Sequence, residues 1–134
     1  MSEFSADSHP GATLDPATAD AVVARARFAG DGLLPAIIQS ADDDAVLMLG
    51  YMNAEALRRT LTEGRVTFWS RSRSEYWRKG DTSGHIQLVR EVALDCDADT
   101  LLVRVHQVGP ACHTGARRCF DVDPLIVSET ETPA

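Results

Sequence analysis

The residues best suited to chemistry are three aspartates and three cysteines that lie in two short stretches of the chain. Asp95, Asp97 and Asp99 alternate with Cys96 and Ala98, so an extended segment would put the carboxylates on one face and the thiol on the other. Oxygen donors suit hard cations such as Mg²⁺, whereas thiolates suit Zn²⁺. The segment therefore indicates two chemically distinct metal sites set back to back.

The three carboxylates converge on one ion only if the segment bends, because residues two apart on a strand are separated by about 6.6 Å. A turn at residues 98–100, between two expected strands, would supply the bend. An EF-hand loop is excluded because its sixth position would be Thr100 and its twelfth His106, where that motif has Gly and Glu. The alternative is an acidic strand end in water. The separate run Asp42–Asp44 is expected to be a turn.

Two further cysteines, Cys112 and Cys119, lie on a glycine-containing loop downstream. Together with Cys96 they would give zinc three thiolate ligands and one open position, which describes a catalytic rather than a structural site. The alternative is that the thiols are buried and unreactive. His113 lies beside Cys112 and could be a fourth ligand, a general base or an ordinary loop residue.

A glycine-rich stretch from Trp77 to His85 carries groups that suit an anion. Its glycines let backbone N–H groups approach a phosphate, and Lys79, Thr82 and Ser83 add donors. It is not a P-loop, because the order Gly-x-x-x-x-Gly-Lys-Ser/Thr is absent. The alternative is a tight surface loop between two strands.

Composition narrows the classes of partner. The net charge of −7 argues against nucleic-acid binding, and no apolar run is long enough to span a membrane. Residues 65–80 nevertheless hold five positive charges and one negative charge, which favours a small phosphorylated ligand. The N-terminus lacks the features of a signal peptide and the three cysteines are an odd number, so we expect a cytoplasmic protein with reduced thiols.

The rest of the chain is expected to form the elements that position these groups. Apolar periodicity and capping residues predict helices at 17–27 and 54–63, and strands at 33–39, 45–52, 65–71, 86–97 and 100–108, with at most a short strand at 125–127. Residues 1–14 and 128–134 are predicted to be tails around a single domain at 15–127. Strands dominate, which indicates a mainly β or α+β fold with antiparallel-rich sheets and two short helices.

Five segments of the chain together resemble the phosphoribosyl-AMP cyclohydrolase family of histidine biosynthesis. They are, in the family's order, Val46–Asn53, Thr67–Ser72, Trp77–His85, Asp95–Asp99, and Ala111–Gly115 with Cys119-Phe120. Each segment alone is a modest signal, whereas five in order are specific. The chain departs from the family pattern at Arg117-Arg118, where a smaller residue is expected before the last cysteine.

The resemblance implies a metal-dependent hydrolase that opens the adenine ring of phosphoribosyl-AMP at the N1–C6 bond, giving the formimino-AICAR ribotide. It implies zinc ligands at Cys96, Cys112 and Cys119, the first from one subunit and the other two from its partner. The three aspartates of Asp95–Asp99 would correspond to magnesium ligands. The implied assembly is an intertwined homodimer with active sites at the interface.

Two roles follow as hypotheses from this chemistry. Neutral water is a poor nucleophile and thiolate ligands donate charge to the metal, so a nearby base should help; we expect His113 to accept the water proton. The substrate's phosphates would be held by basic and hydroxyl side chains, namely Arg71, Arg73, Lys79, Thr82, Ser83 and His85.

Two competing interpretations differ in class from a cyclohydrolase. A zinc nucleobase deaminase carries His-x-Glu and Pro-Cys-x-x-Cys, but this chain has no His-x-Glu and no second cysteine at the required distance from Cys112. A non-catalytic binding module would use zinc only to join a dimer, through a closed site with four protein ligands. Release of ammonia would identify a deaminase. A zinc ion without an exchangeable water would identify a binding module.

Overall fold

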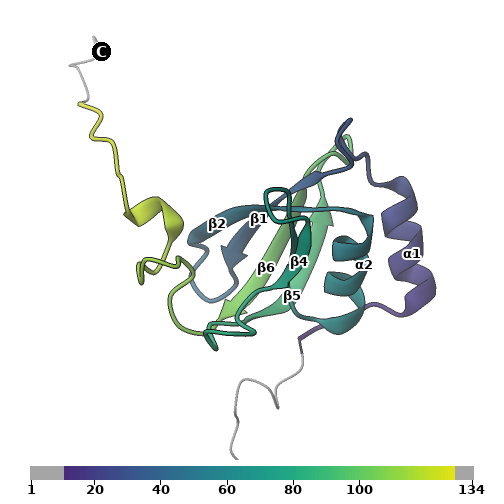
Figure 1. The fold of residues 1–134 in the computed structure, drawn as a ribbon, viewed down its shortest axis with the longest axis horizontal. Coiled ribbons are helices and arrows are strands. Elements are labelled where there is room, and N and C mark those ends of the chain that lie inside the picture. The colour runs from purple at the N-terminus through teal and green to yellow at the C-terminus, as the bar shows by residue number, and fades with distance from the viewer. Residues whose placement is uncertain (1–10, 129–134) are drawn as a thin grey trace, which may run out of the picture.

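The structure, a computed structural model, describes residues 11–128 and combines a four-stranded sheet, a two-stranded hairpin and two helices (Figure 1). The elements are α1 (Pro16–Arg25), β1 (Leu34–Ser40), β2 (Val46–Met52), α2 (Ala54–Glu63), β3 (Thr67–Ser70), β4 (Glu75–Arg78), β5 (Gln87–Leu94), β6 (Leu101–Gln107) and the 3₁₀ turn η2 (Cys119–Asp121). The predicted strand-rich α+β class with two short helices is confirmed. Within the described range, neither helix is long and apolar enough to cross a bilayer.

The larger sheet joins two antiparallel hairpins through one parallel pair. Its strand order is β2-β1-β6-β5, and β1 pairs with β6 in parallel from Ala36 and Leu101 to Ser40 and Val105. The β1–β2 and β5–β6 pairs are antiparallel, as is the separate β3–β4 hairpin. The sheets are therefore antiparallel-rich, as predicted, with the parallel pair at the centre.

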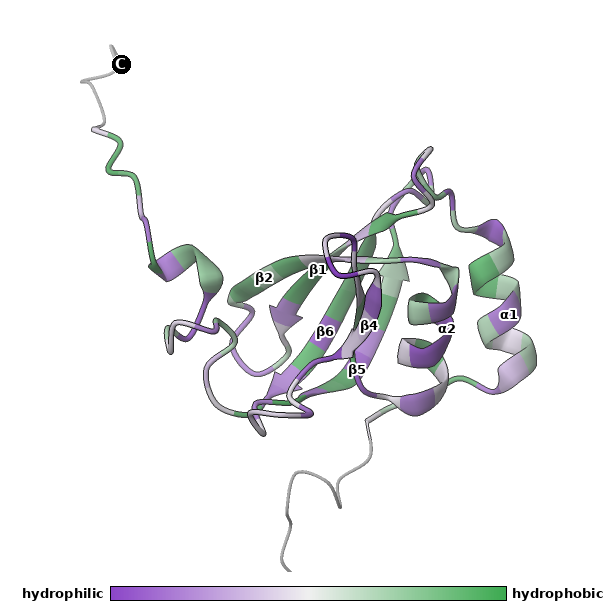
Figure 2. Cartoon of the chain, in the orientation of Figure 1, coloured by the Kyte–Doolittle hydropathy of each residue, from purple (hydrophilic) through white to green (hydrophobic). Residues whose placement is uncertain are grey.

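Strand alternation builds the core. Leu34, Ala36 and Ile38 of β1 are fully buried, and the inward residues of β6 are equally covered. Both rows belong to one apolar cluster that includes Leu57 and Leu61 of α2, and Figure 2 shows the apolar colouring of β1 and β2. Burying each large aliphatic side chain contributes about 1.5–3 kcal/mol, so this cluster fixes the sheet against the helix.

The caps of α2 agree with the sequence prediction. The Asn53 side chain accepts a hydrogen bond from the backbone N–H of Ala56 at 2.8 Å, and Gly64 ends the helix in a left-handed conformation with φ 75°. Helix α1 ends at Arg25, two residues earlier than predicted, because Ala26 is already extended.

The strand predictions were wrong at two places, at β4 and at the end of β5, which stops at Leu94 instead of residue 97. Residues 75–78 form β4, although Trp77 and Arg78 were assigned to a loop. At 125–127, where at most a short strand was expected, the chain forms no strand, and Ile126 is 94% exposed.

The domain boundary at residue 15 stays a prediction, although part of the expected N-terminal tail packs on the domain. The N–H of Ala12 donates to the carbonyl of Val89 at 2.7 Å, and the N–H of Leu14 donates to the carbonyl of Leu61 at 2.8 Å. Residues 1–10 and 129–134 of the two predicted tails lie outside the described residues.

Candidate active site

The three aspartates come together on the turn between β5 and β6. One carboxylate oxygen of each residue lies within 4.8 Å of those of the other two, and all three side chains are exposed. The segment is a turn rather than an extended strand, with Ala98 at φ 63°. The strict strand alternation expected for Asp95–Asp99 is therefore wrong, whereas the bend that convergence requires is present.

Asp95 shapes this turn as well as contributing to the cluster. Its Oδ1 accepts hydrogen bonds from the N–H groups of Asp99 at 3.0 Å and Thr100 at 3.3 Å. Although desolvation acts against it, hydrogen bonding from the Asp99 N–H lowers the pKa of Asp95. Hydrogen bonding to Asp97, and then to Asp95, raises the pKa of Asp99. The carboxyl groups compete for a proton, and a bound divalent cation would relieve that competition.

A small cavity of about 340 Å³ opens beside this turn. Its lining combines the acidic side chains with part of the segment that follows α1, namely Arg27, Phe28, Ala29, Leu33, Pro35, Asp97 and Asp99. The N–H of Arg27 donates to the carbonyl of Ala98 at 2.7 Å, which joins this segment to the turn. Two of the three aspartates, Asp97 and Asp99, therefore border a recess of the surface.

Two of the three predicted zinc ligands lie next to each other elsewhere in the molecule. The Cys112 and Cys119 thiols lie close enough for each to shift the pKa of the other. The Thr114 hydroxyl donates to Cys112 Sγ at 3.1 Å and lowers the pKa of that thiol, while desolvation raises the pKa of Cys119. Thr114 was not predicted, although a hydroxyl two residues after a cysteine on a loop could have indicated it.

Cys96 lies apart from this pair. It is exposed on the β5–β6 turn before β6, whereas the Cys112 loop follows β6. In Figure 1 the turn lies at the upper right and η2, in yellow, at the left. Among the described residues, a group of three potential metal ligands occurs only at the aspartates. One chain therefore brings two thiols together and leaves the third at the far end of the strand.

A second cavity, of about 540 Å³, adjoins the thiol pair. It gathers five of the six predicted phosphate ligands with His113; its lining is Arg73, Glu75, Tyr76, Trp77, Arg78, Lys79, Gly80, Asp81, Thr82, Ser83, His85, Cys112, His113 and Gly115. The sixth residue, Arg71, is not in this lining. Its guanidinium lies 3.5 Å from a carboxylate oxygen of Asp31 and 5.3 Å from the ring centre of Tyr51.

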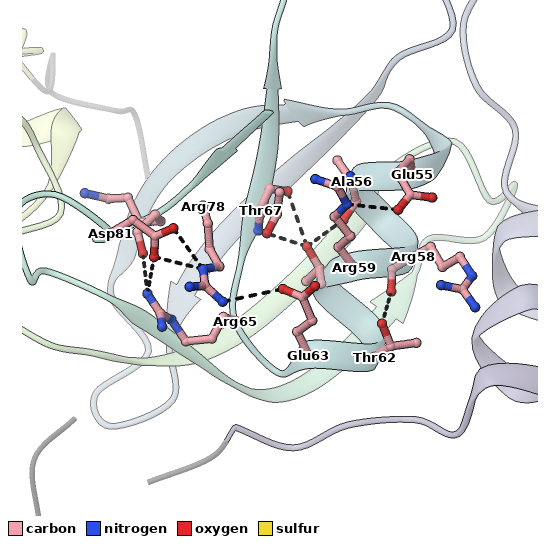
Figure 3. A network of polar contacts seen from close by, with 12 residues as sticks. Glu55, Ala56, Arg58, Arg59, Thr62, Glu63, Arg65, Thr67, Arg78 and Asp81 are labelled. Carbon is pink, nitrogen blue, oxygen red and sulfur yellow. Dashed lines mark hydrogen bonds and ion pairs between the residues drawn. The ribbon is translucent and has the colours of Figure 1, made fainter. Parts of the chain in front are cut away.

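Ion pairs hold the glycine-rich side of this cavity in place (Figure 3). Asp81 accepts hydrogen bonds from Arg78 Nε at 2.8 Å and from Arg65 Nη2 at 3.0 Å. Arg78 also lies 3.7 Å from Glu63 at the end of α2. Tyr76, Trp77 and Arg78 were not predicted as site residues, because their strand was not recognised.

The two arginines that depart from the family pattern fix the cysteine loop. Arg117 pairs with Asp43 on the β1–β2 turn at 2.9 Å and lowers the pKa of that carboxyl through a hydrogen bond. Arg118 donates through Nε to Asp121 in η2 at 2.8 Å. Their size is accommodated because both side chains lie along the surface and find carboxylate partners.

Comparison with known proteins agrees with the resemblance inferred from the five segments. A family model described as phosphoribosyl-AMP cyclohydrolase matches residues 48–121. The chain is 74% identical over 106 residues to the phosphoribosyl-AMP cyclohydrolase of Clavibacter sepedonicus, covering 79% of this chain and 77% of that protein. It is 65% identical over 114 residues to that of Leifsonia xyli (85% and 91%) and 64% identical over 119 residues to that of Streptomyces griseus (88% and 95%). The chain belongs to the phosphoribosyl-AMP cyclohydrolase family.

Proposed function

We propose that this chain opens the adenine ring of phosphoribosyl-AMP by hydrolysis of the N1–C6 bond, as a homodimer that uses zinc and magnesium. Each zinc site would take Cys96 from one protomer and Cys112 and Cys119 from the other. The observation that carries the proposal is the placement of two thiols beside a cavity that also holds His113, with the third thiol beyond β6. Membership of the family favours ring opening over deamination.

The residues present fit both metals. A pair of adjacent thiols with one thiolate-stabilising hydroxyl suits zinc, and three converging carboxylates suit magnesium. When bound, zinc supplies Lewis acidity that lowers the pKa of a coordinated water from 15.7 to about 7. Magnesium at Asp95, Asp97 and Asp99 would neutralise charge beside the substrate or hold the turn.

His113 would accept the proton of the attacking water. It follows a zinc ligand directly in the chain, and its exposed side chain lines the cavity rather than the core. The imidazole therefore lies where water and substrate can both reach it. This placement satisfies the geometric requirement for a general base more directly than that of His106, which pairs with Asp42 at 2.9 Å.

The substrate's phosphates would bind on the glycine-rich side of the same cavity. Arg73 supplies a cation, Thr82 and Ser83 supply hydroxyl donors, and His85 supplies a ring nitrogen. The ion pairs of Asp81 fix the backbone of this loop before the ligand arrives. A preorganised set of donors costs less to order on binding than a mobile loop.

An exposed apolar surface supports the dimer. The face of β2 that points away from the core and the segment around η2 contact each other and expose large apolar side chains, namely Val46, Leu49, Tyr51, Phe120 and Val122. Exposed apolar patches of this kind are typical of protein–protein interfaces.

The direct test combines purified protein with phosphoribosyl-AMP and follows the absorbance change of ring opening. We expect activity that chelator removes and that zinc with magnesium restores, without release of ammonia. Sedimentation in the same samples should show that chelation weakens the dimer, since the ion is shared. Ammonia release, or an unaltered substrate in the metal-loaded protein, would contradict the proposal.

A further inference from the structure

Lys79 is the only lysine among the 134 residues, and the other twelve residues of the Lys and Arg total are arginines. It is also buried, with 6% of its surface exposed. Lysine side chains are rarely buried without a partner, because removing an ammonium from water is costly. Its position therefore requires a compensating interaction.

The backbone around Lys79 is fixed at the end of β4. Its N–H donates to the carbonyl of Val66 at 2.9 Å, and its carbonyl accepts from Arg65 Nη2 at 3.4 Å. The following Gly80 has φ 90°, and a Cβ there would lie 2.5 Å from the backbone of Ile86. Lys79 therefore enters the cavity from a rigid base.

The cavity that Lys79 lines also holds the Cys112 thiol, and the two acidic side chains of its lining, Glu75 and Asp81, are paired with arginines. Lys79 and Cys112 line the same cavity, and Cys119 lies next to Cys112. In residues 11–128 no carboxylate lies within ion-pair distance of Lys79, whereas Arg73 and Arg78 in the same lining are paired with acids.

We propose that Lys79 is a positioning residue for the metal: its ammonium balances the charge of the Cys112 and Cys119 thiolates and strengthens their hold on zinc. The inference rests on the proposed function, because it takes these thiols as zinc ligands, and it replaces the phosphate-binding role expected for Lys79. Three thiolates around Zn²⁺ leave a net negative charge, which a buried cation in the same cavity stabilises.

The test is zinc affinity, measured by competition with a chromophoric chelator in Lys79→Met, Lys79→Gln and Lys79→Arg. Removing a partner next to a metal ligand typically costs 10–100-fold in affinity. We expect that loss in the Met and Gln variants, and affinity within about threefold of the parent in the Arg variant, which keeps the charge. Arg25→Met removes a distant exposed charge from the last turn of α1 and should leave affinity unchanged.

Several outcomes would overturn the inference. Unchanged zinc affinity in both neutral variants, with a raised KM for phosphoribosyl-AMP, would assign Lys79 to phosphate. An equal loss in the Arg variant would assign the effect to shape rather than charge. A failure of the proposed function can be told apart from a failure of this inference. A parent protein that binds zinc through its thiols but leaves phosphoribosyl-AMP intact would refute ring opening. The comparison of zinc affinities would still decide the role of Lys79.

Discussion

Cys96 and Cys112 stand at opposite ends of strand β6, the first before Leu101 and the second after Gln107. Seven strand residues span roughly 20 Å. Two sulfurs bound to one zinc, each about 2.3 Å from the ion, lie within about 5 Å of each other. A single chain therefore does not close a site with three thiolates, whereas two chains related by a twofold axis can close two such sites.

His113→Ala should lower kcat while bound zinc is retained, because the variant loses a proton acceptor and not a metal ligand. General base catalysis contributes about 10²–10⁴-fold, so a loss in that range is expected. Steady-state kinetics with zinc content by atomic absorption measures both quantities. His106→Ala, on the surface of β6 beside Asp42, is the matched control and should keep the parent kcat; an unaffected His113 variant would remove the assignment.

Arg73 and Arg71 should differ in their effect on substrate binding. Arg73 lines the cavity beside the thiols, whereas Arg71 lies against Asp31 and Tyr51. A hydrogen bond to a charged group contributes about 1.5–3 kcal/mol, so Arg73→Met should raise KM about tenfold or more. Arg71→Met should raise it less, and the reverse order in steady-state kinetics would contradict the placement of the phosphates.

Gly80→Ala should destabilise the protein more than Gly84→Ala. Both residues have a left-handed backbone, with φ 90° and 81°, but an added Cβ meets Ile86 at 2.5 Å only at Gly80. The left-handed conformation alone costs about 1–2 kcal/mol for a residue with a Cβ, and overpacking adds about 1–3 kcal/mol. Urea denaturation measures the free energy of unfolding of the two variants. Equal losses would show that the backbone at Gly80 shifts to accommodate the added Cβ.

The ion pair of Asp43 with Arg117 should add stability that depends on pH. Hydrogen bonding to Arg117 lowers the pKa of Asp43 in the folded chain from 3.8. The contribution is therefore present above the unfolded value and is lost as pH falls through the lower folded value. The melting temperature of Asp43→Asn should lie slightly below that of the parent at neutral pH, and the difference should vanish in acid. A difference in melting temperature that persists in acid would show that another interaction of Asp43 causes it.

Local signals in the sequence predicted most of the elements. Asn53 and Gly64 bracket α2 as expected, and the alternation of Leu101, Val103 and Val105 places the buried face of β6 correctly. These features depend on residues that are neighbours in the sequence, so they can be predicted without knowledge of the fold. The turn at Ala98 was also anticipated as the condition for the aspartates to converge.

What the sequence left open depends on long-range packing. Strand β4 has four exposed residues and no alternation, and its turn uses Ser74 at φ 50° in place of a glycine signal. The parallel pairing of Ala36 with Leu101 joins segments far apart in the chain. The same pairing sets the ends of β6. The distance between Cys96 and the other two thiols therefore could not be predicted from the sequence.

Subunit complementation tests the shared site most directly. Cys96→Ser and Cys112→Ser should each be inactive alone, because each removes a zinc ligand from both sites of its homodimer. When the two are refolded together in equal amounts, half of the dimers are mixed, and each mixed dimer carries one site with all three cysteines. We predict about one quarter of the parent activity. Mixed dimers verified by native mass spectrometry that show no more activity than either variant alone would contradict a zinc site divided between two chains.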